Sequence, residues 1–146
     1  MPTRTARTAW NGSLETGEGQ VELTSSQIGT YDVSFPKRSS ETANGFTSPE
    51  ELLAAAHSAC YAMQLSAVLT AAGGTVEALD VKADVTLGAD PAGGFRLTGI
   101  LLTVRGEVTG IDSDAFLAAA TEAKSGCPLS KALTGVEITL DAELEA

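Results

Sequence analysis

The stretch "TSPEELLAAAHSACYAM", residues 47–63, joins a helix start to a long apolar run that contains a cysteine. Ser48 is a natural N-cap, and Pro49 suits the first helical position. Glu51 lies three residues after Ser48, where a capping box places its acidic member. The apolar pattern continues to Ala72, and the following "GG" is typical of a helix end. We therefore predict one helix from Pro49 to Ala72.

Few polar side chains interrupt this helix beyond its first turn. They are His57, Ser58, Gln64, Ser66 and Thr70, with the hydroxyl of Tyr61. A helix that is apolar on nearly all sides must be buried on nearly all sides. Because a chain of 146 residues has few other elements to cover it, we expect a partner chain to cover part of this helix.

Strand patterns lie on both sides of the helix. In the first third, "RTARTAWNGSLETG" and "QVELTSS" flank "GEG", which predicts a hairpin turn, and "TYDVSF" is a third strand that ends at Pro36. Residues 37–47 are polar and predict a loop. After the helix, "ALDVKADVTLGAD" and "FRLTGILLTVRGEV" predict two long strands joined at "PAGG".

The last part of the chain predicts two helices and a strand. Residues 113–125 form the first helix, which Gly126 ends, and "CPLSKAL" starts a short one with Cys127 at the cap and Pro128 at the first position. "VEITLDAELEA" alternates apolar and polar residues, as strands do. The order βββ-α-ββ-αα-β predicts an α+β fold. With no repeat or linker, we expect residues 1–146 to form a single domain.

Composition and charge disfavour several classes of protein. Apolar residues make up 43% of the chain and charged residues 19%, which is typical of a globular protein. The net charge of -10 disfavours nucleic-acid binding. We find no apolar run of the roughly 18 uncharged residues that a membrane span needs, and "MPTRTARTAW" lacks the apolar segment of a signal peptide. The sequence therefore predicts a cytoplasmic protein with neither a nucleic-acid nor a membrane partner.

Cys60, Cys127 and His57 are the candidate reactive side chains. Cys60 lies mid-helix in apolar surroundings, where a free cysteine usually only packs. Cys127 lies at a helix start, where the dipole and the free amides lower a thiol pKa, so it is the better thiolate by local sequence. Two interpretations of the pair stay open. One is a metal site that includes His57, although a fourth ligand and CxxC or HxxxH spacing are missing. The other is a redox pair, in which one thiolate attacks and the second closes a disulfide.

The segments "SPEELLAAAHSAC" and "AKSGCPLSKAL" together resemble the osmotically inducible protein C (OsmC) family, a relative of the organic hydroperoxide resistance protein, Ohr. The likeness runs from "AWNGSLETGEG" to "VEITLDAELEA", and "AAAHSAC" is closer to the OsmC branch. The resemblance implies a thiol peroxidase that reduces hydroperoxides, preferably organic ones. It implies an intertwined homodimer, with central buried helices packed against antiparallel sheets and two sites at the subunit interface. It also implies no bound cofactor and an external dithiol reductant, typically a protein-bound lipoyl group.

The resemblance implies a role for four residues. Cys60 matches the peroxidatic cysteine, Cys127 the resolving one, Glu50 in "PEE" the site glutamate, and Arg38 in "SFPKRSSE" the site arginine, with Lys37 next to it as the other candidate cation. A guanidinium beside Cys60 would lower a thiol pKa that burial raises. Arginine stays charged when partly buried, and a glutamate can supply the partner that such a cation needs.

Helix geometry predicts that the site is shared between two chains. Glu50 and Cys60 are ten residues apart, which is about 15 Å along a helix, so Glu50 cannot easily hold an arginine against the Cys60 of its own chain. Two copies crossing antiparallel near the small residues 54–56 would bring Glu50 of one chain beside Cys60 of the other. One further alternative stays open, a non-enzymatic stress or binding protein of the same fold with inert thiols. Whether His57 contributes stays open as well.

Overall fold

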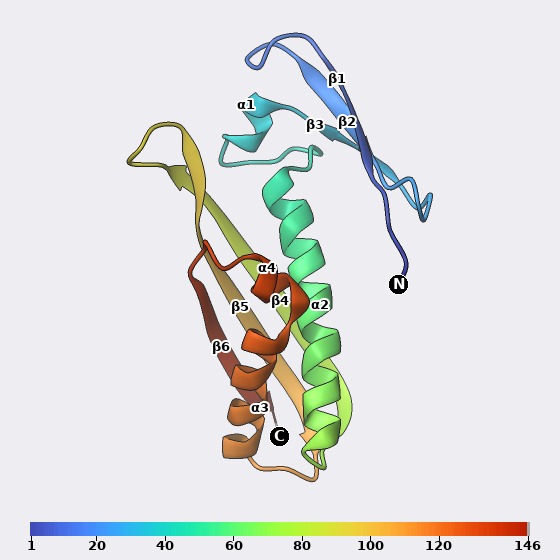
Figure 1. The fold of residues 1–146 in the computed structure, drawn as a ribbon, viewed down its shortest axis with the longest axis vertical. Coiled ribbons are helices and arrows are strands. Elements are labelled where there is room, and N and C mark those ends of the chain that lie inside the picture. The colour runs from blue at the N-terminus through green and yellow to red at the C-terminus, as the bar shows by residue number, and fades with distance from the viewer. Residues whose placement is uncertain (146) are drawn as a thin grey trace. The chain divides into compact units, whose positions relative to one another are not determined.

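A computed structural model describes residues 1–145, and the chain forms two compact units, Met1–Leu52 and Leu53–Ala146 (Figure 1). The element order is βββ-αα-ββ-αα-β. The predicted α+β class is therefore confirmed, with one short helix more than expected. The last residue of the predicted C-terminal strand, Ala146, lies outside the described residues.

The first unit holds a three-stranded antiparallel sheet in the order β1-β2-β3. Its strands are β1 (Arg7–Asn11), β2 (Glu18–Glu22) and β3 (Thr30–Val33). The predicted turn at "GEG" is wrong, because Glu18 and Gly19 already pair with β1. The turn spans residues 12–17 instead. Gly12 has a φ of 97°, which favours glycine, and the Gly17 amide donates to the Ser13 carbonyl at 2.8 Å.

The predicted loop over residues 37–47 is wrong at its start, where a one-turn helix α1 (Phe35–Arg38) follows β3 directly. The Ser34 side chain caps it by accepting from the Lys37 amide. Pro36 lies in the first turn, where its fixed φ suits a helix and its missing N–H costs nothing. Arg38 is therefore held at the end of a helix rather than on a free loop.

The helix predicted from the opening stretch is α2 (Pro49–Ala71), one residue shorter than expected. Ser48 caps it as predicted, since the Glu51 amide donates to the Ser48 hydroxyl at 3.1 Å. The Glu51 carboxylate does not close a capping box, because it accepts a hydrogen bond from the Thr47 hydroxyl at 3.0 Å. The "GG" pair ends the helix, with Gly73 at a φ of 90° and the Gly74 amide bonded to the Leu69 carbonyl.

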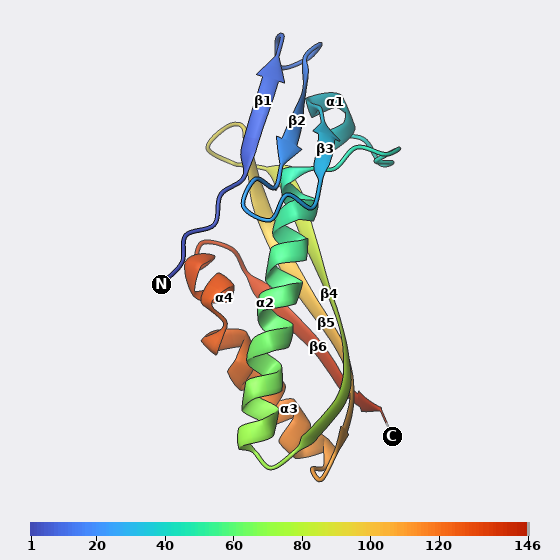
Figure 2. The ribbon, with the colours of Figure 1, turned by 90° about the vertical axis from the view of Figure 1, so that its right-hand side faces the viewer.

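The second unit packs its helices against one face of a three-stranded sheet (Figure 2). The strands are β4 (Thr75–Ala89), β5 (Phe95–Thr109) and β6 (Ile138–Glu145), and the helices beside α2 are α3 (Ser113–Gly126) and α4 (Pro128–Ala132). β4 and β5 form the predicted antiparallel pair. β6 runs parallel to β5, so the expectation of antiparallel sheets is wrong for this pair of strands. A parallel pairing needs a long crossover. The segment with α3 and α4 is that crossover.

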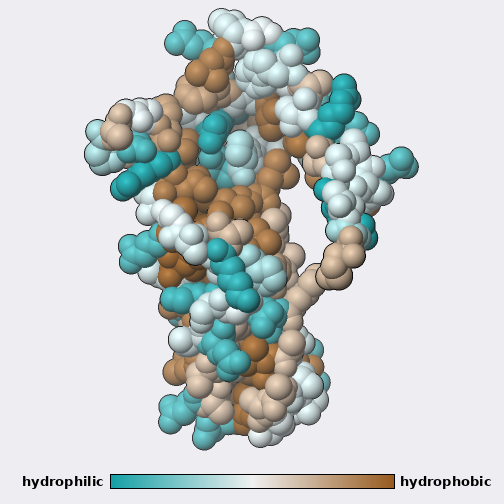
Figure 3. All heavy atoms as spheres, in the orientation of Figure 1, coloured by the Kyte–Doolittle hydropathy of each residue, from teal (hydrophilic) through white to brown (hydrophobic). Residues whose placement is uncertain are grey.

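One stripe of α2 is buried in this unit. Tyr61, Leu65 and Leu69 are fully buried at intervals of four residues and share a core with residues such as Leu102 and Phe116. Burying each such side chain contributes about 2 kcal/mol. Other apolar side chains of α2 reach the surface: Met63 is 74% exposed, and apolar residues are visible among the polar ones in Figure 3. Within the described chain, α2 therefore buries one face, not nearly all sides.

The expectation that no run is long enough for a membrane span was wrong. Residues 52–72 carry no Asp, Glu, Lys or Arg, and α2 has a mean hydropathy of 1.4 over an 18-residue window that is 22% buried. By length and composition alone this helix could cross a membrane. That is weak evidence, because the core helix of a soluble protein meets the same criterion. The buried stripe of Tyr61, Leu65 and Leu69 fits a core helix.

Candidate functional site

The fold brings the two cysteines together in the second unit. Cys60 lies on α2 and Cys127 at the start of α4, and their sulfurs are 3.1 Å apart although the residues are 67 positions apart in the chain. Both thiols are free; Cys127 is fully buried and Cys60 partly so. A disulfide has a bond length of about 2.05 Å. The two sulfurs can therefore reach bonding distance with a small movement.

The surroundings of the two sulfurs give them different acidities. Burial raises the pKa of Cys127, but the amide of Ser130, the thiol of Cys60, the hydroxyl of Ser130 and the amide of Leu129 together outweigh burial and leave that pKa below its ordinary value. Burial chiefly raises the pKa of Cys60, the Leu129 amide opposes this, and Cys127 adds to it. Cys127 is therefore the more acidic of the two thiols, in line with the local sequence.

The structure also brings Arg38 and Glu50 together, within the first unit. Arg38 Nη2 lies 2.7 Å from Glu50 Oε1, and Nε lies 3.1 and 3.2 Å from the two carboxylate oxygens. The side chains are 33% and 11% exposed. Such a two-pronged, charge-assisted contact fixes the plane of a guanidinium. Lys37 is oriented elsewhere, with its Nζ 6.0 Å from the ring centre of Phe46, so Arg38 is the cation that pairs with Glu50.

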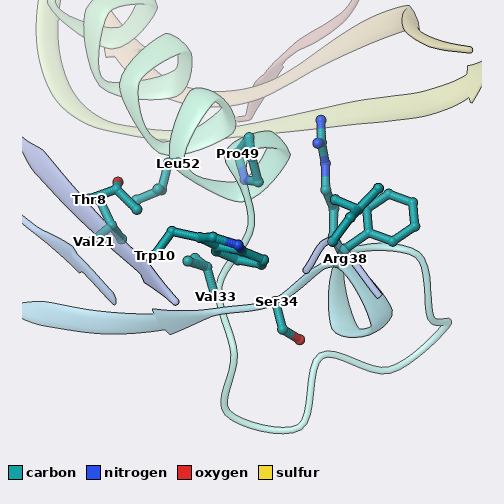
Figure 4. A pocket seen from close by; sticks show the side chains of 10 residues that line it. Thr8, Trp10, Val21, Val33, Ser34, Arg38, Pro49 and Leu52 are labelled. Carbon is teal, nitrogen blue, oxygen red and sulfur yellow. The ribbon is translucent and has the colours of Figure 1, made fainter. Parts of the chain in front are cut away.

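An apolar pocket of about 370 Å³ lies beside Arg38 in the first unit. Figure 4 shows Trp10 from β1, Val33 from β3 and Leu52 from the first turn of α2 around it, with Arg38 at one side. Leu14, Val21 and Phe35 add to its apolar lining. The pocket can therefore hold a hydrocarbon group next to a fixed positive charge. Sequence analysis did not predict it, because its lining comes from four separate segments.

His57 is fully buried in the second unit. Its Nε2 lies 2.8 Å from the hydroxyl oxygen of Ser130, and its Nδ1 is buried without a hydrogen-bond partner. Desolvation by burial lowers the pKa of His57, so the neutral imidazole is favoured. Sequence analysis missed Ser130; its place three residues after the cap residue Cys127 was the available signal.

The alternative of a metal site is not supported. Among residues 1–145, no group of three or more His, Cys, Asp and Glu side chains is arranged to hold a metal ion. The Nε2 atom of His57 contacts the Ser130 hydroxyl oxygen.

A buried neutral histidine makes stability depend on pH, and we expect the protein to lose stability as the pH falls below about 6.5. The unfolded chain binds a proton there that the folded chain resists, because burial lowers the pKa of His57. One proton accounts for at most about 1.4 kcal/mol per pH unit. Urea unfolding of the wild type and His57→Gln, at about pH 7.5 and about pH 5.5, isolates this contribution, because glutamine does not titrate. An equal loss in both proteins would contradict it.

The sequence profile of the family described as OsmC-like protein matches residues 42–141, a range that includes Glu50, both cysteines and parts of both units. The chain belongs to the OsmC-like protein family. It is 41% identical over 137 residues to the protein named peroxiredoxin OsmC of Escherichia coli K12, which covers 94% of this chain and 93% of that protein. The protein of the same name from Shigella flexneri is equally similar.

Solved structures agree with this family membership. The organic hydroperoxide resistance protein OhrB of Bacillus subtilis superposes with a TM-score of 0.74 at 25% identity, covering 95% of this chain and 98% of that one. An organic hydroperoxide resistance protein from Elizabethkingia anophelis gives a TM-score of 0.77 at 25% identity and 99% coverage of both chains. The expected α+β fold of the OsmC and Ohr proteins is thus confirmed.

Proposed function

We propose that this protein is a thiol-dependent peroxidase that reduces organic hydroperoxides to alcohols, and hydrogen peroxide more weakly. The observation that carries the proposal is the pair of free thiols with sulfurs 3.1 Å apart, in a chain 41% identical to a protein named peroxiredoxin. Two free thiols at this distance can give two electrons to an oxidant and form a disulfide.

The reaction takes two steps before reduction. The Cys60 thiolate attacks the terminal oxygen of ROOH; the O–O bond breaks, the alcohol leaves with a proton, and Cys60 becomes a sulfenic acid. The Cys127 thiolate then attacks the Cys60 sulfur; the S–O bond breaks, water leaves with a second proton, and the disulfide forms. The depressed pKa of Cys127 suits this role, because it also makes Cys127 the better leaving group when the disulfide is reduced.

Cys60 needs a positive charge to react first. In the second unit, burial raises its pKa and the Cys127 charge raises it further. A guanidinium favours the thiolate and can also stabilise the alkoxide that develops as the O–O bond breaks. Arg38 is the proposed source, because Glu50 already fixes its orientation. Glu50 neutralises the cation in the resting site, which reduces the cost of partial burial.

The apolar pocket beside Arg38 supports a preference for organic hydroperoxides. A pocket of about 370 Å³ lined by Trp10, Val33 and Leu52 can bury a hydrocarbon chain, which contributes about 0.8 kcal/mol per methylene. Hydrogen peroxide has no such group.

The site is proposed to form between two copies of the chain. α2 is helical at both Glu50 and Cys60, and ten residues of helix span about 15 Å. Two antiparallel copies of α2 crossing near Ala54–Ala56 would bring the Arg38–Glu50 pair of one subunit to the thiols of the other. Small side chains at the crossing permit a close approach of the backbones. The exposed apolar positions of α2, such as Met63, are surface that a second copy would cover.

Mixing two inactive variants tests the shared site. Glu50→Ala removes the support of Arg38, and Cys60→Ser removes the attacking sulfur. If the site spans two chains, the mixed dimer carries one site that has both residues and one that lacks both. We expect peroxide reduction to recover to about one working site per mixed dimer, because a two-fold dimer holds two sites. No recovery, with subunit exchange verified by native mass spectrometry, would mean that Glu50 acts on its own chain.

We also propose a dithiol as the reductant and the cytoplasm as the compartment. A dithiol, such as a protein-bound lipoyl group, can reduce the disulfide through a mixed disulfide and then close its own ring. Two cysteines that cycle through a disulfide need a reducing compartment, for which the cytoplasm is the proposed place. No bound cofactor takes part in these steps.

A peroxidase assay tests the function. Cumene hydroperoxide and hydrogen peroxide are compared as oxidants, each with dihydrolipoamide and then with glutathione as reductant. We expect the fastest turnover with cumene hydroperoxide and dihydrolipoamide. Thiols that stay reduced in both peroxides would favour the alternative of a non-enzymatic stress or binding protein.

A further inference from the structure

Four polar side chains of the second unit form a connected cluster that the two-cysteine reaction does not fully use. His57 and Cys60 come from adjacent turns of α2, and Cys127 and Ser130 from the start of α4. The His57 Nε2–Ser130 Oγ distance is 2.8 Å, and the Cys127–Cys60 sulfur distance is 3.1 Å. Ser130 links the two pairs: it lies in the first turn of α4, three residues after the cap residue Cys127, and its hydroxyl is among the groups that lower the Cys127 pKa.

Packing alone explains the buried His57 poorly. Its Nδ1 has no hydrogen-bond partner and the side chain is fully buried. An unpartnered buried polar atom costs about 1–3 kcal/mol. A leucine of similar size would avoid this cost. The other ring nitrogen, Nε2, lies 2.8 Å from the Ser130 hydroxyl oxygen. An apolar side chain could not make this hydrogen bond.

The protons available in the cluster limit which groups can donate and which must accept. A serine hydroxyl has one proton to donate and lone pairs to accept. If that proton goes to the Cys127 sulfur, Ser130 Oγ must accept from His57, so Nε2 carries the imidazole proton. Nδ1 is then an unprotonated acceptor, and the imidazole stays neutral, as burial requires. In that arrangement the order of donation is His57 to Ser130 to Cys127.

We propose that His57 is a positioning residue for the resolving cysteine: it orients the Ser130 hydroxyl, which donates its proton to the Cys127 sulfur and stabilises the thiolate. This rests on the proposed function for the name "resolving", but the arrangement of His57, Ser130 and Cys127 does not depend on it. His57 does not touch the substrate and transfers no proton in this role.

Other groups around Cys127 act on the same sulfur and are the same in all variants that the test compares, with residue 60 a serine in each of them. Residue 60 lies next to it on α2, and the pKa of Tyr61 is raised chiefly by burial and further by the Cys127 charge. The amides of Leu129 and Ser130 also lower the Cys127 pKa. Because a Ser130→Ala chain keeps the residue-130 amide, that substitution isolates the hydroxyl.

The test measures the Cys127 thiol directly. A Cys60→Ser chain retains Cys127 as its one cysteine, and the ultraviolet absorbance of its thiolate reports the pKa without a reagent that must reach a buried sulfur. We expect Ser130→Ala to raise this pKa by about one unit or more, as the loss of a hydrogen bond to a charged group implies. His57→Leu should raise it too, and His57→Gln, which keeps an N–H near the same place, by less. Ser125→Ala is the matched control, because its hydroxyl bonds backbone carbonyls of α3.

The double variant separates this role from a structural one. Because His57 acts only through Ser130, His57→Leu should change nothing further in a Ser130→Ala chain, whereas independent effects would add. Nitrogen NMR of an untagged chain, in which His57 is the one histidine, should show a neutral ring protonated at Nε2. An unchanged Cys127 pKa in Ser130→Ala, additive effects, or a proton on Nδ1 would each overturn the proposal. The Ser130→Ala titration and the NMR measurement still test the proposal if His57→Leu does not fold.

Failure of the His57 proposal and failure of the proposed peroxidase function give different results. The thiol titration needs no peroxide, so a chain that consumes none can still show the expected Cys127 shifts. If peroxide is consumed, Ser130→Ala should also leave more Cys60 as sulfinic acid per turnover, because slower disulfide formation gives over-oxidation more time.

Discussion

Cys60→Ser is expected to abolish peroxide reduction, whereas Cys127→Ser is expected to consume about one equivalent of organic hydroperoxide per chain and then stop. The reason is the proposed division of labour between two sulfurs 3.1 Å apart. Without Cys60 no sulfenic acid forms at the site. Without Cys127 the sulfenic acid forms but has no internal thiol to condense with.

Mass spectrometry of the stalled Cys127→Ser chain checks this expectation. Cys60 should carry one added oxygen at first and two after longer exposure, as sulfenic acid passes to sulfinic acid. Far-ultraviolet circular dichroism of both variants is the control for folding. Full turnover of Cys127→Ser with a dithiol would show that an external thiol resolves the intermediate. Activity in Cys60→Ser would mean that the more acidic Cys127 is the attacking sulfur.

Arg38→Ala is expected to slow the reaction of Cys60 with organic hydroperoxide by orders of magnitude. The groups of the second unit leave the Cys60 pKa raised. Without the Arg38 charge, no cation of the proposed site lowers this pKa, and less of Cys60 is thiolate. A two-unit change in a thiol pKa corresponds to about 2.7 kcal/mol, and loss of alkoxide stabilisation in the transition state adds to it. Stopped-flow rates across pH, with the Cys60 pKa read from the alkylation rate in a Cys127→Ser chain, measure both effects.

Two matched variants sharpen the Arg38 test. Arg38→Lys keeps the charge but loses the two-pronged contact with Glu50, so it should recover part of the rate. Lys37→Ala removes the neighbouring cation, which lies by Phe46 instead, and should leave the rate near that of the wild type. A normal Cys60 pKa and rate in Arg38→Ala would move the activating role to another basic residue, such as Arg4 or Arg96.

Features set by neighbouring residues were predicted well from the sequence. Ser48 and Pro49 fix the start of α2 through cap chemistry, and the glycines after Ala72 fix its end. Cys127 and Pro128 also stand at the start of α4 as predicted, although the Cys127 side chain makes no capping hydrogen bond. The first hairpin was misplaced because "GEG" and the segment ending at Gly17 are both rich in turn residues. Strand pairing of Glu18 and Gly19 decided between them.

Features that depend on residues far apart in the chain could not be predicted from local sequence patterns. His57 and Ser130 are 73 positions apart, and no periodicity links them. The pairing of Arg38 with Glu50 was expected from family resemblance rather than from the residues themselves. The one-turn helix α1 that places Arg38 was missed, because four residues are too few to show a helical period. The exposed part of α2 could not be predicted either, because it depends on how the sheet and α3 pack against this helix.

The most direct test of the account is the stoichiometry of oxidation in the wild-type protein. The reduced chain, without any added reductant, is treated with one equivalent of cumene hydroperoxide per chain, and free thiols and disulfide-linked peptides are then measured. We expect the loss of both thiols, one cumyl alcohol formed per chain, and a disulfide between Cys60 and Cys127 within one chain. Retention of both thiols, or a disulfide that links two chains, would contradict it.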